Sequence, residues 1–292
     1  MKPFTLGTRG SRLAVAQSQQ VADAITAATG RPVVLQIVST RGDRDRSRPL
    51  SQLGGKGLFT QELEDGLRAG ELDLAVHSLK DLPTDDPDGL AVGCFPVRED
   101  PRDAFVGPPL AEVPEGARVG SGSLRRRAQI LAIRPDLELV DIRGNVDTSL
   151  RKVDDGTVVG TILAMAGMNR LGIERPDIQP LSVEQMVPAV GQGALGVQCR
   201  ADDAVLLEAL SAIDHPETRQ RVTVERSFLA AYGGGCNVPA ACYAWVDEVG
   251  LHAVAIAQHT DGGLVRHSRS GADAVALGQA LAAAVRESDG SR

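Results

Sequence analysis

Aromatic side chains are scarce in this chain of 292 residues, at 3% of the total. Proteins that bind single-stranded nucleic acid rely on aromatic rings as stacking platforms, so this scarcity argues against that class. The net charge of -7 argues the same way, because a general polyanion binder is basic overall. No apolar run approaches the roughly 20 residues of a membrane helix. The opening stretch MKPFTLGTRG also lacks the apolar segment of a secretory signal.

Cysteine is rare too, with four residues and neither a CxxC pair nor a cysteine–histidine spacing typical of metal sites. Scattered thiols in a chain of this length are typical of a reducing compartment. We therefore expect a cytoplasmic protein without a metal, a nucleic-acid partner or a membrane partner. The length allows two or three domains.

Strand-like and helical segments alternate through most of the chain. Strands are predicted at 4–8, 33–38, 72–78, 117–121, 137–142 and 156–164. Helical periodicity lies between them, over 11–28 and in the spacing of Phe59, Leu63 and Leu67. This alternation predicts an α/β fold with mainly parallel sheets.

The last quarter of the chain has a different order of elements. A charged helix at 216–231 precedes three strand-like segments at 240–246, 251–258 and 262–268, and an alanine-rich helix ends the chain. Consecutive short strands with a closing helix predict a small α+β domain with a three-stranded sheet.

One short pattern occurs twice in the predicted α/β part. LGTRGSRLAVAQ at 6–17 and VGSGSLRRRAQI at 119–130 each run from a strand through Gly and Ser to Arg and a helix. Two interpretations stay open, namely ordinary strand-to-helix turns or one anion-binding device used once per domain. Free N–H groups at a helix start attract anions, and guanidinium groups suit carboxylates. The arginines concerned are Arg9, Arg12, Arg125 and Arg126.

Further polar residues follow the ends of predicted strands, where open α/β sheets bind their ligands. Arg143 and Arg170 each lie near such an end, beside or close to a glycine. LAVHSLKDLP at 74–83 runs from an apolar strand into a polar turn that contains Asp81. A lysine next to a carboxylate is often only a surface pair, but this position favours a functional Asp81. Several arginines placed in this way indicate a ligand with several carboxylates or phosphates.

One cysteine lies in an open context. Cys236 follows three glycines in AAYGGGCNVPA, which leaves room for a large group beside the sulfur. Cys94, Cys199 and Cys242 lie in strand-like segments and are expected to be small core residues. Cys236 then either attacks a substrate without a neighbouring base or carries a group permanently.

The chain resembles the porphobilinogen deaminase family in six segments that occur in the family's order. These are VHSLKDLP, REDPRDAF, GSLRRRAQ, RGNV, PAVGQGALG and GGCNVP. The resemblance runs from about residue 5 to the C-terminus. It implies two domains similar to type II periplasmic binding proteins with the active site in the cleft between them, and a small third domain. The implied boundaries are 1–97 with 194–214, then 98–193, then 215–292.

The resemblance also implies an activity, which is the joining of porphobilinogen molecules into hydroxymethylbilane for tetrapyrrole biosynthesis. Cys236 matches the cysteine that carries a covalent dipyrromethane cofactor through a thioether, and Asp81 matches the catalytic aspartate. Implied contacts to the cofactor come from Ser78, Lys80, Ser123, Arg125 and Arg126. Implied contacts to the substrate and the growing chain come from Arg9, Ser11, Gln17, Lys56, Arg143 and Arg170. The segment 41–57 resembles the family's mobile loop, and the family suggests a monomer.

The chain departs from the family pattern at several positions. Ser149 stands in RGNVDTSL where the family has an arginine, Gln52 replaces a loop lysine, and Gly233 replaces the glutamate before GGC. Arg151 is two residues from Ser149, on a different face of the predicted helix. These departures keep a second hypothesis open, a non-catalytic two-domain protein that captures a small polyacid. A third hypothesis, a cysteine-dependent acyl transferase, depends only on Cys236.

Overall fold

The computed structural model describes residues 2–40, 42, 60–142, 144–233, 238–259 and 262–288. The chain divides into two compact units. Unit 1 comprises Met1–Arg98 with Ala194–Gln220, and unit 2 comprises Glu99–Gly193 with Arg221–Arg292. Within the described ranges, no helix has both the length and the apolar character needed to span a membrane.

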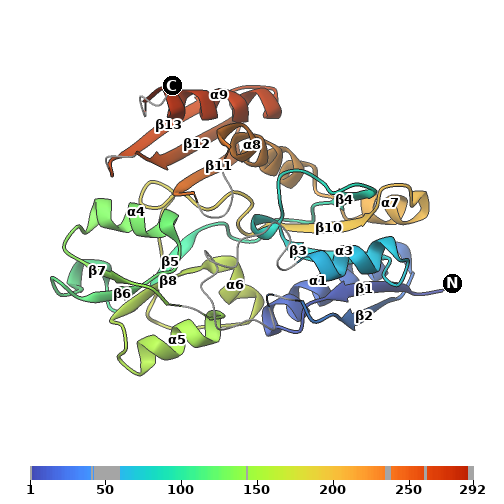
Figure 1. The fold of residues 1–292 in the computed structure, drawn as a ribbon, viewed down its shortest axis with the longest axis horizontal. Coiled ribbons are helices and arrows are strands. Elements are labelled where there is room, and N and C mark those ends of the chain that lie inside the picture. The colour runs from blue at the N-terminus through green and yellow to red at the C-terminus, as the bar shows by residue number, and fades with distance from the viewer. Residues whose placement is uncertain are drawn as a thin grey trace. The chain divides into compact units, whose positions relative to one another are not determined.

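A five-stranded mixed sheet forms the centre of unit 1 (Figure 1). Its strands, in spatial order, are β2 (Val33–Ile37), β1 (Phe4–Thr8), β3 (Leu74–Ser78), β10 (Leu195–Arg200) and β4 (Leu90–Cys94). β1 is parallel to β2 and β3, whereas β10 is antiparallel to β3 and β4. The helices of this unit include α1 (Arg12–Thr29), α3 (Gln61–Arg68) and α7 (Ala204–Ser211). A segment from late in the chain therefore fills the place between β3 and β4.

Unit 2 contains a second five-stranded sheet of equivalent topology. Its strands, in spatial order, are β7 (Glu138–Val140), β6 (Arg118–Gly120), β8 (Gly160–Ala164), β5 (Asp103–Val106) and β9 (Ile178–Pro180). β6 is parallel to β7 and β8, and β5 is antiparallel to β8 and β9. The helices are α4 (Leu124–Ile133), α5 (Val146–Asp154) and α6 (Met165–Arg170). Each sheet thus places one antiparallel strand between three parallel strands and an edge strand of the same direction as those three, which confirms the predicted α/β class.

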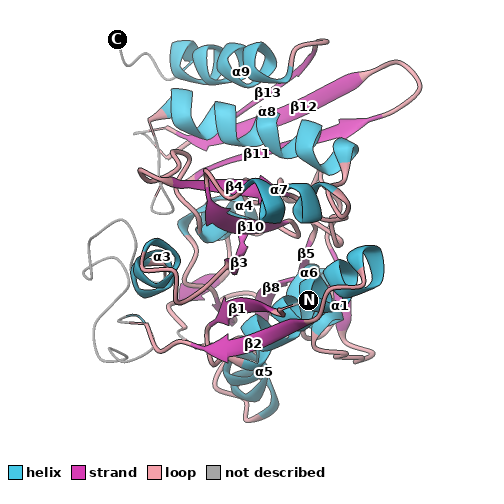
Figure 2. Cartoon of the chain, turned by 90° about the vertical axis from the view of Figure 1, so that its right-hand side faces the viewer, coloured by secondary structure: helices cyan, strands magenta, loops and turns pink. Residues whose placement is uncertain are grey.

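The C-terminal part of the chain forms a three-stranded antiparallel sheet with helices along it (Figure 2). The strands are β11 (Ala240–Val246), β12 (Leu251–Gln258) and β13 (Leu264–Ser270), and the helices are α8 (Pro216–Tyr232) and α9 (Ala274–Ser288). Phe228 of α8 and Leu281 of α9 share one buried cluster with Cys242 and Ala253 of the sheet. The predicted small α+β arrangement is confirmed, although its third strand begins two residues later than predicted.

Core positions agree with the sequence patterns where the pattern is periodic. Leu63 and Leu67 of α3 are fully buried, as the four-residue spacing predicts, whereas Phe59 lies outside the described residues. The predicted core cysteines Cys94, Cys199 and Cys242 are also fully buried. The sequence patterns did not predict strands β5 and β9. All four residues of β5 are buried, so its sequence has no alternation to detect.

Candidate functional site

The repeated Gly-Ser-Arg pattern forms the start of a helix in both units. Ser11 is the N-cap of α1, and its side chain accepts a hydrogen bond from the backbone N–H of Ala14 at 3.2 Å. Ser123 is the N-cap of α4 and accepts from the backbone N–H of Arg126 at 3.5 Å. Both serines therefore satisfy a backbone donor at a helix start. Whether these helix starts bind anions stays a prediction.

In unit 1 several predicted site residues lie together around the end of β3. Gln17 is buried on α1, and its Nε2 donates to the hydroxyl of Ser78 at 2.9 Å. Neighbouring His77 is buried and pairs through Nε2 with Oε1 of Gln198 at 3.2 Å. Burial lowers the pKa of His77 to about 4, with the hydrogen bond to Gln198 opposing this shift and the nearby charge of Arg9 adding to it. His77 is therefore neutral at pH 7, and Arg9 lies close enough to this group to act on it.

Asp81 ends a short 3-10 helix, Leu79–Asp81, that directly follows β3. Leu79 is buried, and its N–H donates to the carbonyl of Ala194 at 3.0 Å, which fixes the start of the turn. The Asp81 side chain is exposed, and no described residue forms an ion pair with it. Lys80, beside it, is half-buried. The predicted catalytic carboxylate therefore lies directly after the end of β3 and is exposed.

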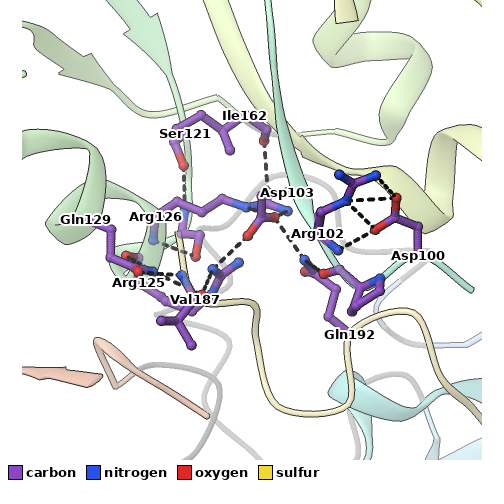
Figure 3. Close-up of polar contacts among 12 residues, drawn as sticks. Asp100, Arg102, Asp103, Ser121, Arg125, Arg126, Gln129, Ile162, Val187 and Gln192 are labelled. Atoms are coloured by element: carbon purple, nitrogen blue, oxygen red, sulfur yellow. Dashed lines mark hydrogen bonds and ion pairs between the residues drawn. The ribbon is translucent and has the colours of Figure 1, made fainter. Parts of the chain in front are cut away.

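In unit 2 the predicted arginines surround a carboxylate that the sequence analysis did not single out (Figure 3). Asp103, at the start of β5, is fully buried. Arg125 Nη1 lies 2.8 Å from its Oδ2, and Arg126 Nη2 lies 2.7 Å from its Oδ1. Gln192 Nε2 donates to the same Oδ1 at 3.0 Å. The only sequence signal for Asp103 was its place in the REDPRDAF segment.

The electrostatics of Asp103 combine two opposing effects. Burial by itself raises the pKa of a carboxyl group, but the charges of Arg125 and Arg126 and the hydrogen bonds outweigh burial. The pKa of Asp103 is therefore held well below its usual range. Burial lowers the pKa of Arg125, which Asp103 partly offsets. The cluster is thus a carboxylate shared by two guanidinium groups.

Arg170, the last residue of α6, is a further buried cation. Its Nη2 donates to the carbonyl of Gly193 at 2.8 Å, and burial lowers its pKa to about 10. The Nε atom is buried and has no hydrogen-bond partner among the described residues. An unmatched guanidinium donor of this kind suits a carboxylate ligand, as does the arginine pair of α4. The described residues of unit 2 therefore fit a group that bears several acid side chains.

Several predicted positions cannot be placed in this site. Lys56, Arg143 and Cys236, and the departure at Gln52, lie outside the described residues. Ser149 is buried on α5, and its hydroxyl donates to the carbonyl of Asn145 at 3.2 Å. Arg151 is exposed, so it does not share the buried environment of Ser149.

Two family models match most of the chain. Residues 4–208 match "Porphobilinogen deaminase, dipyromethane cofactor binding domain", and residues 219–287 match "Porphobilinogen deaminase, C-terminal domain". The chain belongs to the porphobilinogen deaminase family. The family model for the cofactor-binding domain includes Asp81, Asp103, Arg125 and Arg126, and the model for the C-terminal domain includes Cys236.

Named members of the porphobilinogen deaminase family are similar over nearly the whole chain. A porphobilinogen deaminase of Roseiflexus castenholzii is 46% identical over 293 residues, which is 98% of this chain and 97% of the relative. A porphobilinogen deaminase of Paracoccus denitrificans is 47% identical over 296 residues, which is 97% of this chain and 94% of the relative.

Solved structures with a similar chain are more distant. The second substrate binding domain of a putative amino acid ABC transporter from Streptococcus pneumoniae is 9% identical, with a TM-score of 0.46 over 73% of this chain and 92% of that chain. A periplasmic binding protein of Salmonella typhimurium is 15% identical, with a TM-score of 0.39 over 75% of this chain and 97% of that chain.

Proposed function

We propose that this protein is an enzyme that joins four molecules of porphobilinogen head to tail into hydroxymethylbilane, with release of four molecules of ammonia. The reaction is a step of tetrapyrrole biosynthesis. Its primer is a dipyrromethane held by a thioether to Cys236. The observation that carries the proposal is the match of residues 4–208 to the dipyrromethane-binding domain of the family, which includes the exposed Asp81.

The dipyrromethane supplies an electron-rich pyrrole at the end of a tethered chain, to which the next ring is added. Asp81 supplies a fixed negative charge beside the reacting rings. Porphobilinogen loses ammonia to give an electron-poor species, and pyrrole nitrogens carry positive charge before and after the new bond forms. A preorganised carboxylate stabilises charge that develops in this way. Asp81 also accepts pyrrole N–H hydrogen bonds, which orients the ring.

The arginines offset the acid groups of the rings. Each pyrrole carries an acetate and a propionate, so every addition brings two more carboxylates. We assign Ser78, Lys80, Ser123, Arg125 and Arg126 to the cofactor. We assign Arg9, Ser11, Gln17, Lys56, Arg143 and Arg170 to the substrate and the growing chain. This explains why a protein with net charge -7 places arginines at strand ends.

The proposal also includes the domain boundaries, the oligomeric state, the cellular location and the partners of the protein. Three domains, 1–97 with 194–214, 98–193 and 215–292, would separate the catalytic aspartate, the arginine pair and the tethering cysteine. The protein would act as a cytoplasmic monomer on a small-molecule substrate, without a nucleic-acid or membrane partner. Sedimentation of the purified protein would test the monomer.

Intact mass and turnover test the function. Mass spectrometry should show an adduct of two pyrrole units on the wild-type chain and none on Cys236→Ala. Asp81→Asn should keep the adduct but lower turnover at least about 100-fold, as expected when a charge that stabilises the transition state is removed. Asp85→Asn serves as the matched control, because Asp85 is an exposed aspartate four residues later, in the loop before β4.

Each rival hypothesis predicts a different result. A binding protein would retain porphobilinogen without releasing ammonia. A cysteine-dependent acyl transferase would not respond to Asp81→Asn. An unmodified chain with full turnover would contradict the tethered primer.

A further inference from the structure

Arg125 and Arg126 are successive residues of α4, yet both reach the same carboxylate. Successive helical side chains point about 100° apart and do not normally face each other. Here Arg125 Nη1 donates to Oδ2 of Asp103 at 2.8 Å, and Arg126 Nε donates to Oδ1 at 2.9 Å. The fully buried Asp103 therefore draws two divergent side chains to one point (Figure 3).

The charge of Asp103 makes this convergence possible. Two guanidinium groups held next to each other repel, and removing them from water is costly unless a counter-charge is present. The carboxylate accepts from both and leaves the pair with one net positive charge. Without it, Arg125, whose side chain is only 6% exposed, would be a buried cation beside another cation.

The shared carboxylate does not occupy all of the N–H donors of either guanidinium group. Each group has five N–H donors. Among the described residues, the other contacts are Arg125 Nη1 to the carbonyl of Val187 at 2.7 Å and Arg126 Nη1 to that of Ile162 at 2.9 Å. Further donors of both groups therefore remain for the acid groups of a ligand. Arg126 is the more accessible, at 13% exposed.

Asp103 also holds the chain segment that leads out of unit 2. Gln192 Nε2 donates to Asp103 Oδ1 at 3.0 Å and to the carbonyl of Pro101 at 2.8 Å. Arg125 and Gln129 donate to Val187 of the same segment. One carboxylate thus connects β5, the first turn of α4 and the segment 187–193.

We propose that Asp103 is a positioning residue for the acid-binding arginines, holding the guanidinium groups of Arg125 and Arg126 in a fixed orientation with a single net charge. Asp103 acts through these two side chains and touches neither substrate nor cofactor. The inference rests on the proposed function, in which the pair binds the acid groups of the dipyrromethane.

The test compares two substitutions of Asp103 with a neighbouring control. Asp103→Asn removes the charge, whereas Asp103→Glu keeps the charge but moves the carboxylate by one methylene. Asp100→Asn is the control, because Asp100 forms a more exposed ion pair, with Arg102 at 2.7 Å, and does not bond to the arginines of α4 in the contacts that the structure gives it. The readouts are the fraction of chains that carry the two-pyrrole adduct, by intact mass, and kcat/KM below the melting temperature of each variant.

We expect both Asp103 variants to lower the loaded fraction at least about twofold and kcat/KM at least about tenfold, a modest loss of preorganisation. Asp100→Asn should match the parent in both. Since Asp103 acts in part through Arg126, the separate losses of Asp103→Asn and Arg126→Gln should not multiply in the double variant Asp103→Asn/Arg126→Gln, as expected for coupled residues.

Three results would overturn the proposal. One is a folded Asp103 variant with the loading and kcat/KM of the parent. Another is a double variant whose losses multiply. The third is that neither Asp103→Asn nor Asp103→Glu folds, which would make the ion pair purely structural. A parent chain with neither adduct nor turnover contradicts the proposed function instead, and is recognised before any variant is compared.

Discussion

Arg125 and Asp103 form an ion pair from which solvent is almost excluded. Arg125 Nη1 lies 2.8 Å from Asp103 Oδ2, and the side chains are 6% and 0% exposed. Because the folded state holds the pKa of Asp103 below its value in the unfolded chain, the pair stabilises the fold above the usual carboxyl range. This stabilisation is lost as the pH falls toward the lowered pKa. Removing one partner of such a pair leaves a buried charge and costs roughly 3–5 kcal/mol.

His77 should make stability depend on pH in a different window. Its pKa falls from 6.5 to about 4 on folding, so the unfolded chain binds the proton more readily between these values. The free energy of unfolding should therefore decrease by about 3 kcal/mol as the pH falls from 6.5 to 4, at about 1.4 kcal/mol per pKa unit. Urea unfolding at several pH values measures this slope.

His77→Gln should flatten the slope between pH 6.5 and 4, because glutamine does not titrate. His267→Gln is the control, since His267 pairs only with Ser288 on the C-terminal sheet and helix in the contacts that the structure gives it. An unchanged slope in His77→Gln would assign the pH dependence to other groups.

Glu225 should be among the most sensitive positions of α8. It is fully buried, and its two carboxylate oxygens accept from the N–H groups of Gly191 at 2.7 Å and Ala244 at 3.0 Å. In Glu225→Gln the amide NH2 faces one of these N–H donors, and that donor loses its acceptor. The free energy of unfolding, measured in urea, should therefore decrease by roughly 1–3 kcal/mol. The exposed Glu287 gives the control Glu287→Gln. Equal stability of the two variants would contradict this role.

Gly193 should tolerate no side chain. Its φ is +85°, and a Cβ there would collide with the backbone oxygen of Glu99. Gly116 has φ +72° with nothing within 4 Å of a Cβ, so Gly116→Ala isolates the cost of the backbone conformation. Thermal unfolding should show a loss of roughly 1–2 kcal/mol for Gly116→Ala. Gly193→Ala should lose about 1–3 kcal/mol more because of overpacking.

The buried thiols should be inert in the folded protein. Burial raises the pKa of Cys94, and raises that of Cys199 to about 11, so neither forms a reactive thiolate near neutral pH. Cys242 is also fully buried. An aromatic disulfide reagent should therefore label at most Cys236 in the native protein, and not even Cys236 once it carries a thioether. Rapid labelling of a second thiol would contradict the burial of these cysteines.

Periodic spacing of apolar residues and short Gly-Ser-Arg patterns were sufficient to predict local structure. The spacing of Leu63 and Leu67 predicted α3, and the Gly-Ser-Arg pattern predicted two helix starts, which Ser11 and Ser123 cap. These features depend on residues within a few positions of each other, so the chain carries them in linear form. The six family segments likewise predict Asp81 and Cys236 as site residues.

Asp103 and its partners could not be found in this way. Its contacts with Arg125 and Gln192 join residues 22 and 89 positions apart, and no local pattern distinguishes a buried, shared carboxylate from an exposed one. The pairing of His77 with Gln198 spans 121 positions and depends on β10 lying beside β3. Burial and charge pairing arise only when distant strands and helices come together, and this is why they emerged from the folded arrangement rather than from the order of residues.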